Sequence, residues 1–430
     1  MTQISPIRKI FNEMNLINDL RVINKEPCII DLTLGQPHLP VNPVLIEGLN
    51  NFLSSPKCSL QFGYSPGPGR VQTRKAIVDL MSYYYPALEC NINNVMCTNG
   101  ANQGLWNAFS SALKPDDSAV VFAPYFSQYA LQIREIGAKL ITLDTLKTNF
   151  RPNITNLDNL LLKHQDIKCL ILNNPVNPSG VVWLKEELIE LADCLRKHKQ
   201  IIIIQDEVYR DLSYSKFYSL LDIAPDLFPR VITIFSCAKA LAGAPDLRTG
   251  MIFAHENLIN KLVHQQMAVT AEVSLLSQVA LTSVLNAKLS GQSDHLVWEN
   301  ISKSAYKENI DILCDVFSTG PITIQNKPDA GFFVLLNCSA LINKPLSDKI
   351  LKKNNRFFPS YIVIKTDMEI IDLLMNCYDI ACLPGSAFGI ESSKGFIRVS
   401  CATVTNNILF FIKQMNQLLS DLNFVGGYYE

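Results

Sequence analysis

The chain has 430 residues, of which 48% are apolar and 18% are charged. This composition excludes a disordered or fibrous protein, and the length favours two folded units over one. The 38 basic and 39 acidic side chains give a net charge of −1, so the charge balance predicts no binding to nucleic acid or to an anionic membrane surface.

The 12 cysteines are scattered along the chain, without a CxxC pair or histidines at zinc-finger spacing. They are typical of reduced, mostly buried thiols, and no pattern predicts a metal site. The first residues lack the apolar core and cleavage site of a secretory signal. No window approaches the roughly 18 uninterrupted apolar residues of a membrane span. We therefore expect a cytoplasmic protein without a membrane segment.

Residues 1–45 are rich in proline and asparagine and show no alternation of strand and helix patterns. From residue 95 onward, short β-branched apolar runs alternate with helical patterns. The runs fall at 95–98, 119–122, 140–143, 169–172, 201–204, 231–235 and 250–253. This alternation predicts a mostly parallel seven-stranded sheet covered by helices, in a large domain that spans residues 46–297.

Apolar residues at helical spacing predict helices at 105–113 and 186–196, between these runs. A second region begins near Trp298 with a helix pattern at about 301–317, and it ends with an amphipathic pattern at about 406–419. We therefore predict an α/β protein with a smaller α+β domain formed from both chain ends. Residues 298–430 would build this domain, and residues 1–45 would pack on it.

The residues that follow the strands are the first candidates for a site, because ligands bind beyond the carboxyl ends of the strands in an open parallel sheet. After the first run, Gly100 permits close approach of the backbone, and Ala101 and Asn102 begin a helix with free N–H groups. Such a terminus favours an anion such as phosphate. An ordinary turn with a helix cap is the alternative.

A loop with two prolines, Pro175 and Pro178, follows the run 169–172 and would fix the direction of Asn177. A rigid turn alone would require neither the second asparagine nor both prolines. Asp206 follows the run 201–204, where a buried carboxylate would need a cationic or strongly donating partner. The alternative is an aspartate that caps a helix.

Lys239 follows the run 231–235, three residues after Ser236 and nine before Arg248. A lysine becomes a nucleophile when burial and neighbouring groups hold its amine neutral, and its best-known use is a Schiff base. A solvated surface lysine is the alternative interpretation of Lys239 taken alone.

Together these motifs resemble the class I/II aminotransferases of the fold-type-I pyridoxal phosphate enzymes. The resemblance extends from about Ile30 to Arg398, and the motifs occur in the order and spacing of that family. They are Tyr64-Ser65-Pro66 with Gly69 and Arg74, Asn99 to Asn102, Ala123-Pro124-Tyr125-Phe126 with Tyr129, Asn177 to Gly180, Asp206 to Tyr209, Ser236 to Lys239, Pro384 to Gly389 and Phe396 to Ser400.

The resemblance implies a catalytic role for Lys239, Asp206 and Tyr209. Lys239 would form the Schiff base with pyridoxal phosphate and move a proton at the substrate α-carbon. Asp206 would pair with the pyridine nitrogen and keep it protonated, so that the ring accepts electrons. Asn177 and Tyr209 would hydrogen-bond the phenolic oxygen of the cofactor, and Phe126 would stack on its ring.

The resemblance also implies binding roles at the two ends of the site. Backbone groups of Gly100, Ala101 and Asn102, with the side chains of Ser236 and Arg248, would hold the cofactor phosphate. Tyr64 would reach the phosphate of a neighbouring subunit, which predicts a homodimer.

The substrate α-carboxylate would be bound by Arg398, with Asn177 and Gly35 beside it. An arginine in a structural salt bridge is the alternative for Arg398. The family's reaction would then transfer an amino group from an amino acid to a 2-keto acid in two half-reactions, a ping-pong scheme.

The choice of substrate is weakly marked in the sequence. We can assign no arginine to a second carboxylate, and five aromatic residues could line the pocket, which mildly favours a neutral or aromatic amino acid. These residues are Phe11, Tyr64, Phe126, Tyr129 and Phe333. Two departures from the family pattern stand near the lysine: Ala238 replaces a common hydroxyl residue, and one additional residue precedes Arg248.

Two other functions stay open. A β-lyase of the same fold, acting on cysteine conjugates or cystathionine, shares proton removal at the α-carbon. A non-catalytic, cofactor-binding regulator would carry an added DNA-binding domain, which the roughly 45 residues before the catalytic body do not accommodate. A dinucleotide site is disfavoured, because no strand precedes Gly67-Pro68-Gly69 and no third glycine follows it.

Overall fold

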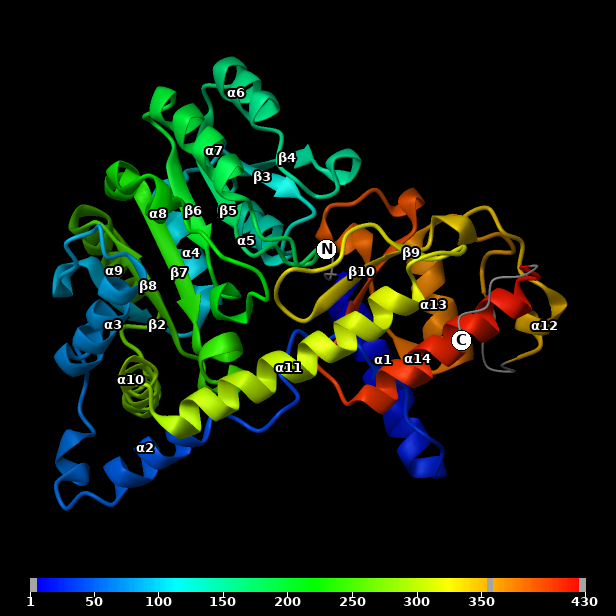
Figure 1. Ribbon diagram of the computed structural model, residues 1–430, viewed down its shortest axis with the longest axis horizontal. Coiled ribbons are helices and arrows are strands. Elements are labelled where there is room, and N and C mark those ends of the chain that lie inside the picture. Colours follow the sequence, from blue (N-terminus) through cyan, green and yellow to red (C-terminus); the bar gives the residue numbers. More distant parts are fainter. Residues whose placement is uncertain (1–5, 354–358, 425–430) are drawn as a thin grey trace.

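The computed structural model describes residues 6–353 and 359–424. Seven strands form one sheet in the order β2-β8-β7-β6-β5-β3-β4 (Figure 1). The strand β8 runs antiparallel to its neighbours β2 and β7, and the other neighbouring strands pair in parallel. The bounds are β2 Val95–Thr98, β3 Ser118–Ala123, β4 Lys139–Asp144, β5 Ile167–Asn173, β6 Ile202–Asp206, β7 Val231–Ser236 and β8 Gly250–Ala254. Each strand overlaps one predicted run, so the predicted sheet is confirmed.

The central strands bury both faces, because successive side chains of a strand point to opposite sides. Cys169 and Ile171 of β5 belong to a core with helices α4 (Ala101–Ala112), α5 (Gln128–Glu135) and α9 (Glu256–Val269). Leu170 and Leu172 belong to the opposite core. This core includes α3 (Val71–Tyr84), α6 (Ile154–Lys163), α7 (Lys185–Lys197), α8 (Leu220–Ile223) and α10 (Leu275–Ser290). The predicted helical cover of the sheet is therefore confirmed.

A second lobe contains an antiparallel sheet in the order β12-β13-β10-β9. Its strands are β9 Thr323–Ile324, β10 Phe333–Asn337, β12 Leu383–Pro384 and β13 Phe396–Ser400. The accompanying helices are α11 (Ser293–Val316), α12 (Asp348–Leu351), α13 (Asp367–Tyr378) and α14 (Thr405–Asp421). Figure 1 shows α11 running from beside α10 in the first lobe into the second. The predicted boundary at residues 297 and 298 falls inside α11, and the domain limits stay a prediction.

The N-terminal segment contains a helix that its composition did not predict, α1 (Pro6–Asn24). Ile10 of this helix belongs to the core of the second lobe. The short strand β1 (Ile30–Asp31) then pairs in parallel with β11 (Ile380–Ala381), and α2 (Pro43–Leu53) leads into the first lobe. Within the described residues, we find no helix with both the length and the apolar character that crossing a membrane requires.

Candidate active site

A cavity of about 810 Å³ opens where β5, β6 and β7 end and where the second lobe meets the sheet. Eleven of the predicted site residues line it. They are Gly35, Ala101, Asn102, Phe126, Asn177, Asp206, Tyr209, Ser236, Lys239, Arg248 and Arg398. The strand ends therefore bring residues from distant parts of the sequence to one place, as ligand sites in open α/β sheets do.

Lys239 lies on the turn Cys237–Leu241, directly after β7. Its amine donates a hydrogen bond to the carbonyl oxygen of Gly35. Burial, with the positive charges of Arg398 and Arg248, lowers the pKa of Lys239 to about 8, although Asp206 opposes the shift. A minority of the amine, far larger than for an ordinary lysine, is therefore neutral near physiological pH, and the neutral form is the nucleophile. The geometry does not support the alternative of a solvated surface lysine.

Asp206 is 3% exposed at the end of β6. The hydroxyl of Tyr129 donates to its Oδ2 at 2.7 Å, and the backbone N–H of Val208 donates to its Oδ1 at 3.2 Å. Burial raises the pKa of Asp206, while these two donors and Lys239 act in the opposite direction. A cationic group facing Asp206 from the cavity would further stabilise the carboxylate.

Arg398 lies on β13 with 4% of its surface exposed. Its guanidinium donates to Asn177 Oδ1 at 3.3 Å and to the carbonyl of Thr33, and it stacks 3.9 Å from the ring centre of Phe333. Burial lowers the pKa of Arg398 to about 10. Its Nε has no hydrogen-bond partner, and no carboxylate within the described ranges forms a salt bridge with it. This buried cation is therefore suited to an anion from solution, and the structural salt bridge weighed as an alternative is not observed.

The helix α4 begins beside the cavity at Gly100, which has a φ of 78° and provides no side-chain cap. A Cβ at this position would lie 2.6 Å from Nη2 of Arg248, a flexible side-chain end that would have to move, and the positive φ itself favours glycine. The residues Pro245–Leu247 form a short turn, after which the guanidinium of Arg248 reaches the carbonyl of Asn99 at 3.5 Å. The additional residue before Arg248 therefore does not remove this side chain from the cavity.

The sequence model of the family "Aminotransferase class I and II" matches residues 28–409. The chain belongs to this family. An aspartate aminotransferase of Thermotoga maritima is 26% identical over 403 residues, which are 93% of each chain. A probable aspartate/prephenate aminotransferase of Rickettsia bellii is 25% identical over 320 residues, 74% of each chain.

Solved structures of aminotransferases share the fold. The aspartate aminotransferase of Thermotoga maritima superposes with a TM-score of 0.78 at 24% identity, covering 96% of this chain and 97% of the other. An aromatic aminotransferase from Pyrococcus horikoshii also superposes with a TM-score of 0.78, at 22% identity, covering 97% of this chain and 100% of the other. The protein is thus an aminotransferase, and its family uses pyridoxal phosphate.

Several features of this aminotransferase could not be predicted. Arg8 of α1 and Arg134 of α5 line the cavity, although no arginine was assigned near the substrate side chain. Phe11, Phe126 and Phe333 line it as expected. Tyr129 does not line it, because this side chain is fully buried and donates to Asp206. Tyr64 does not line the cavity of its own subunit, and its place in a neighbouring subunit's site stays a prediction.

Tyr64 is 95% exposed and lines a separate surface depression with Phe62 and Glu272. Gly100 also does not line the cavity directly, but it adjoins Ala101 and Arg248, which do. Since one subunit is described, the contact of Tyr64 with a partner's phosphate stays a prediction.

One cluster elsewhere combines residue types that bind metals: Asp158 on α6, Cys194 on α7 and His198 directly after α7. His198 Nε2 lies 2.6 Å from Asp158 Oδ1, and the ammonium of Lys197 lies 3.2 Å from Asp158 Oδ2. Because Lys197 already provides a positive charge there, we interpret the cluster as a hydrogen-bonded group between the helices.

Proposed function

We propose that the chain is a pyridoxal-phosphate-dependent aminotransferase that moves the amino group of an L-amino acid to a 2-keto acid in two half-reactions. The observation that carries the proposal is that a lysine of lowered pKa, a buried carboxylate and a buried arginine without a carboxylate partner face one cavity. These groups are Lys239, Asp206 and Arg398.

The donors around the cavity fit pyridoxal phosphate. The uncapped start of α4 at Gly100, Ala101 and Asn102, with Ser236 and Arg248, would hold a phosphate. At the other end Asp206 would face the ring nitrogen. When bound, the cofactor supplies a cationic ring that stabilises negative charge at the α-carbon of the amino acid.

The protein's own groups then have separate tasks. Arg398, beside Asn177 and Gly35, would bind and orient the substrate α-carboxylate. The amine of Lys239 would accept the α-proton and deliver it again, because its pKa of about 8 suits both directions near neutral pH. Asp206 would keep the ring nitrogen protonated.

Three side chains would contact the ring of the cofactor. Tyr209, 5% exposed, and Asn177 would hydrogen-bond the phenolic oxygen of the cofactor, and Phe126 would cover the ring face.

For the substrate side chain we propose a neutral or aromatic amino acid. The cavity lining includes apolar side chains that suit such a substrate: Ile7, Phe11, Leu34, Leu131 and Phe333. A second candidate is a dicarboxylic amino acid, which Arg8 and Arg134 in the same lining favour, as do the names of the aspartate aminotransferase relatives.

The proposal includes a homodimer in the cytoplasm, with Tyr64 reaching the partner's cofactor phosphate. Its support is an exposed apolar surface around this residue: Leu60 is 84%, Phe62 56% and Tyr64 95% exposed. Exposed apolar groups that gather on one surface are typical of an interface.

The test is a panel of amino acids added to the purified protein with pyridoxal phosphate, with turnover and the visible absorption band of the cofactor as readouts. We expect phenylalanine and leucine to react and to need a keto acid for continued turnover. Preference for aspartate, lost in Arg8→Gln or Arg134→Gln, would select the second candidate. Release of pyruvate from cysteine conjugates without a keto acid would replace both with the β-lyase.

A further inference from the structure

The residue after Asp206 is a second buried carboxylate, Glu207, which is 2% exposed. β6 ends at Asp206, and neighbouring side chains along an extended backbone point to opposite faces. Asp206 therefore lines the cavity, whereas Glu207 lies on the other side of the sheet, beside Tyr85 at the end of α3. The reaction proposed above uses the first carboxylate and assigns no task to the second.

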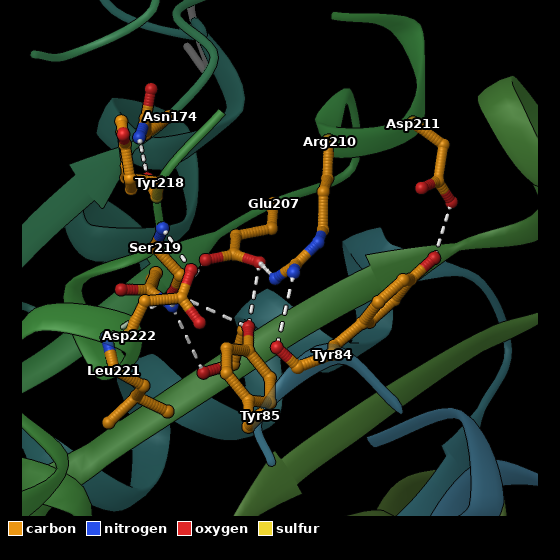
Figure 2. A network of polar contacts seen from close by, with 12 residues as sticks. Tyr84, Tyr85, Asn174, Glu207, Arg210, Asp211, Tyr218, Ser219, Leu221 and Asp222 are labelled. Carbon is orange, nitrogen blue, oxygen red and sulfur yellow. Dashed lines mark hydrogen bonds and ion pairs between the residues drawn. The ribbon is translucent and has the colours of Figure 1, made fainter. Parts of the chain in front are cut away.

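Three donors bind the Glu207 carboxylate. The hydroxyl of Tyr85 donates to Oε2 at 2.7 Å, Arg210 Nη1 donates to the same oxygen at 3.0 Å, and Gln205 Nε2 donates to Oε1 at 2.6 Å. Figure 2 shows Tyr85 and Arg210 converging on Glu207 from different segments. Such complete pairing is what a buried charge requires.

Arg210 is itself held on several sides. Its guanidinium carbon lies 4.0 Å from the ring centre of Tyr84 and 5.0 Å from those of Tyr85 and Phe217. Nη2 donates to the carbonyl of Tyr84 at 3.4 Å. The next residue, Asp211, accepts a hydrogen bond of 2.6 Å from the Tyr84 hydroxyl (Figure 2).

The segment between these anchors is short. The backbone N–H of Arg210 donates to the carbonyl of Glu207 at 3.0 Å, which closes a turn that contains Tyr209. Asp206 and Tyr209, the two residues next to the anchors, both line the cavity. Any shift of Glu207 or Arg210 would therefore move the groups that face the cofactor.

We propose that Glu207, Arg210 and Tyr85 are positioning residues that fix the orientation of Asp206 and Tyr209 toward the cofactor, an inference that rests on the proposed function. Stability alone would not require this arrangement, because apolar side chains of similar volume often replace a buried ion pair without loss. A fixed orientation favours it, since hydrogen bonds specify direction and apolar contacts do not.

The variants are Glu207→Gln and the milder Tyr85→Phe, which removes one hydroxyl. The second lobe offers matched controls, because Asp421 is a carboxylate with 1% of its side chain exposed that accepts a hydrogen bond of 3.0 Å from the buried Tyr378. Asp421→Asn and Tyr378→Phe therefore make the same chemical changes away from the cavity. Thermal melting of all four variants compares their losses of stability.

The readouts are kcat, KM, the affinity for pyridoxal phosphate, and the pH midpoint of the visible band of the bound cofactor. We expect Glu207→Gln to lower kcat by about 10- to 100-fold, as a small misplacement of reacting groups does, with a smaller change of KM. Tyr85→Phe should change kcat and the midpoint in the same direction to a lesser extent. Asp421→Asn and Tyr378→Phe should leave both unchanged.

Equal behaviour of the Glu207→Gln and Tyr85→Phe variants and their controls would overturn the positioning role. If Glu207→Gln does not fold, the comparison of kcat and the pH midpoint between Tyr85→Phe and its control Tyr378→Phe tests the positioning role. Asp206→Asn distinguishes a failure of the proposed function from a failure of the positioning role. An unchanged midpoint and an unchanged kcat in this variant would overturn the proposed function. A lower kcat in Asp206→Asn, with an unchanged kcat in Tyr85→Phe and Glu207→Gln, would overturn only the positioning role.

Discussion

Replacing Tyr129 with phenylalanine removes the hydroxyl that donates to Asp206 at 2.7 Å and leaves the ring in place. Both residues are buried, at 0% and 3% exposure. A hydrogen bond to a charged group contributes about 1.5–3 kcal/mol, which corresponds to about 1–2 pKa units. This bond lowers the pKa of Asp206 and opposes the effect of burial. Tyr129→Phe should therefore raise the pKa of Asp206.

The sign of the effect follows from the proposed role of Asp206. The carboxylate must be ionised to keep the ring nitrogen cationic, so a higher pKa causes activity to be lost at a higher pH during acidification. The acidic limb of the kcat/KM profile, which reports groups of the free enzyme, should move upward by about 1–2 pH units. The control is Tyr306→Phe, because the buried Tyr306 hydroxyl has no hydrogen-bond partner among the residues that the structure describes. An acidic limb that stays in place in Tyr129→Phe would refute the reasoning.

Three further predictions concern the cofactor. The neutral amine of Lys239 is the form that reacts, and its pKa is about 8. The rate at which the apoprotein captures pyridoxal phosphate should therefore rise with pH through about 8 and then level off. A capture rate that does not depend on pH would contradict this prediction. Gly100→Ala should weaken pyridoxal phosphate binding by about tenfold or more in a titration, since the left-handed backbone resists a Cβ and the Cβ would displace the Arg248 guanidinium. Gly291→Ala, with a φ of 68° and open space around it, should leave the affinity unchanged. Tyr64→Phe should weaken cofactor binding in a protein that elutes as a dimer, and full affinity would remove Tyr64 from the site.

The sheet was predictable because each strand has a local pattern of apolar residues in the sequence. A run such as 201–204, apolar at every position, has few alternatives to a central strand covered on both faces, and β6 occupies residues 202–206. The candidate residues were predictable for a related reason, since the ends of parallel strands meet at one edge. Asp206 ends β6, Ser236 ends β7, and Lys239 lies three residues after β7.

The helix α1 was missed although its apolar residues recur at helical spacing. Ile7, Ile10, Phe11 and Met14 follow the pattern of a helix face, but the proline- and asparagine-rich composition of residues 1–45 obscured it. Without α1, no argument from the sequence could bring Arg8 to the cavity, and the substrate pocket was therefore predicted without its arginines.

Contacts between side chains of distant segments also lay beyond the sequence. Tyr129 matched a family motif, yet its hydrogen bond to Asp206 depends on how α5 packs against β6. Likewise, Tyr85 and Glu207 are 122 residues apart in the sequence, and only folding places the Tyr85 hydroxyl 2.7 Å from Glu207 Oε2.

The central claim is that Lys239 is the residue that binds pyridoxal phosphate covalently. Borohydride reduction of the protein with its cofactor, followed by peptide mass spectrometry, tests it directly. We expect the pyridoxyl group on the peptide that contains Lys239 and on no other lysine. A protein that retains no cofactor, or a label on a different lysine, would contradict the account.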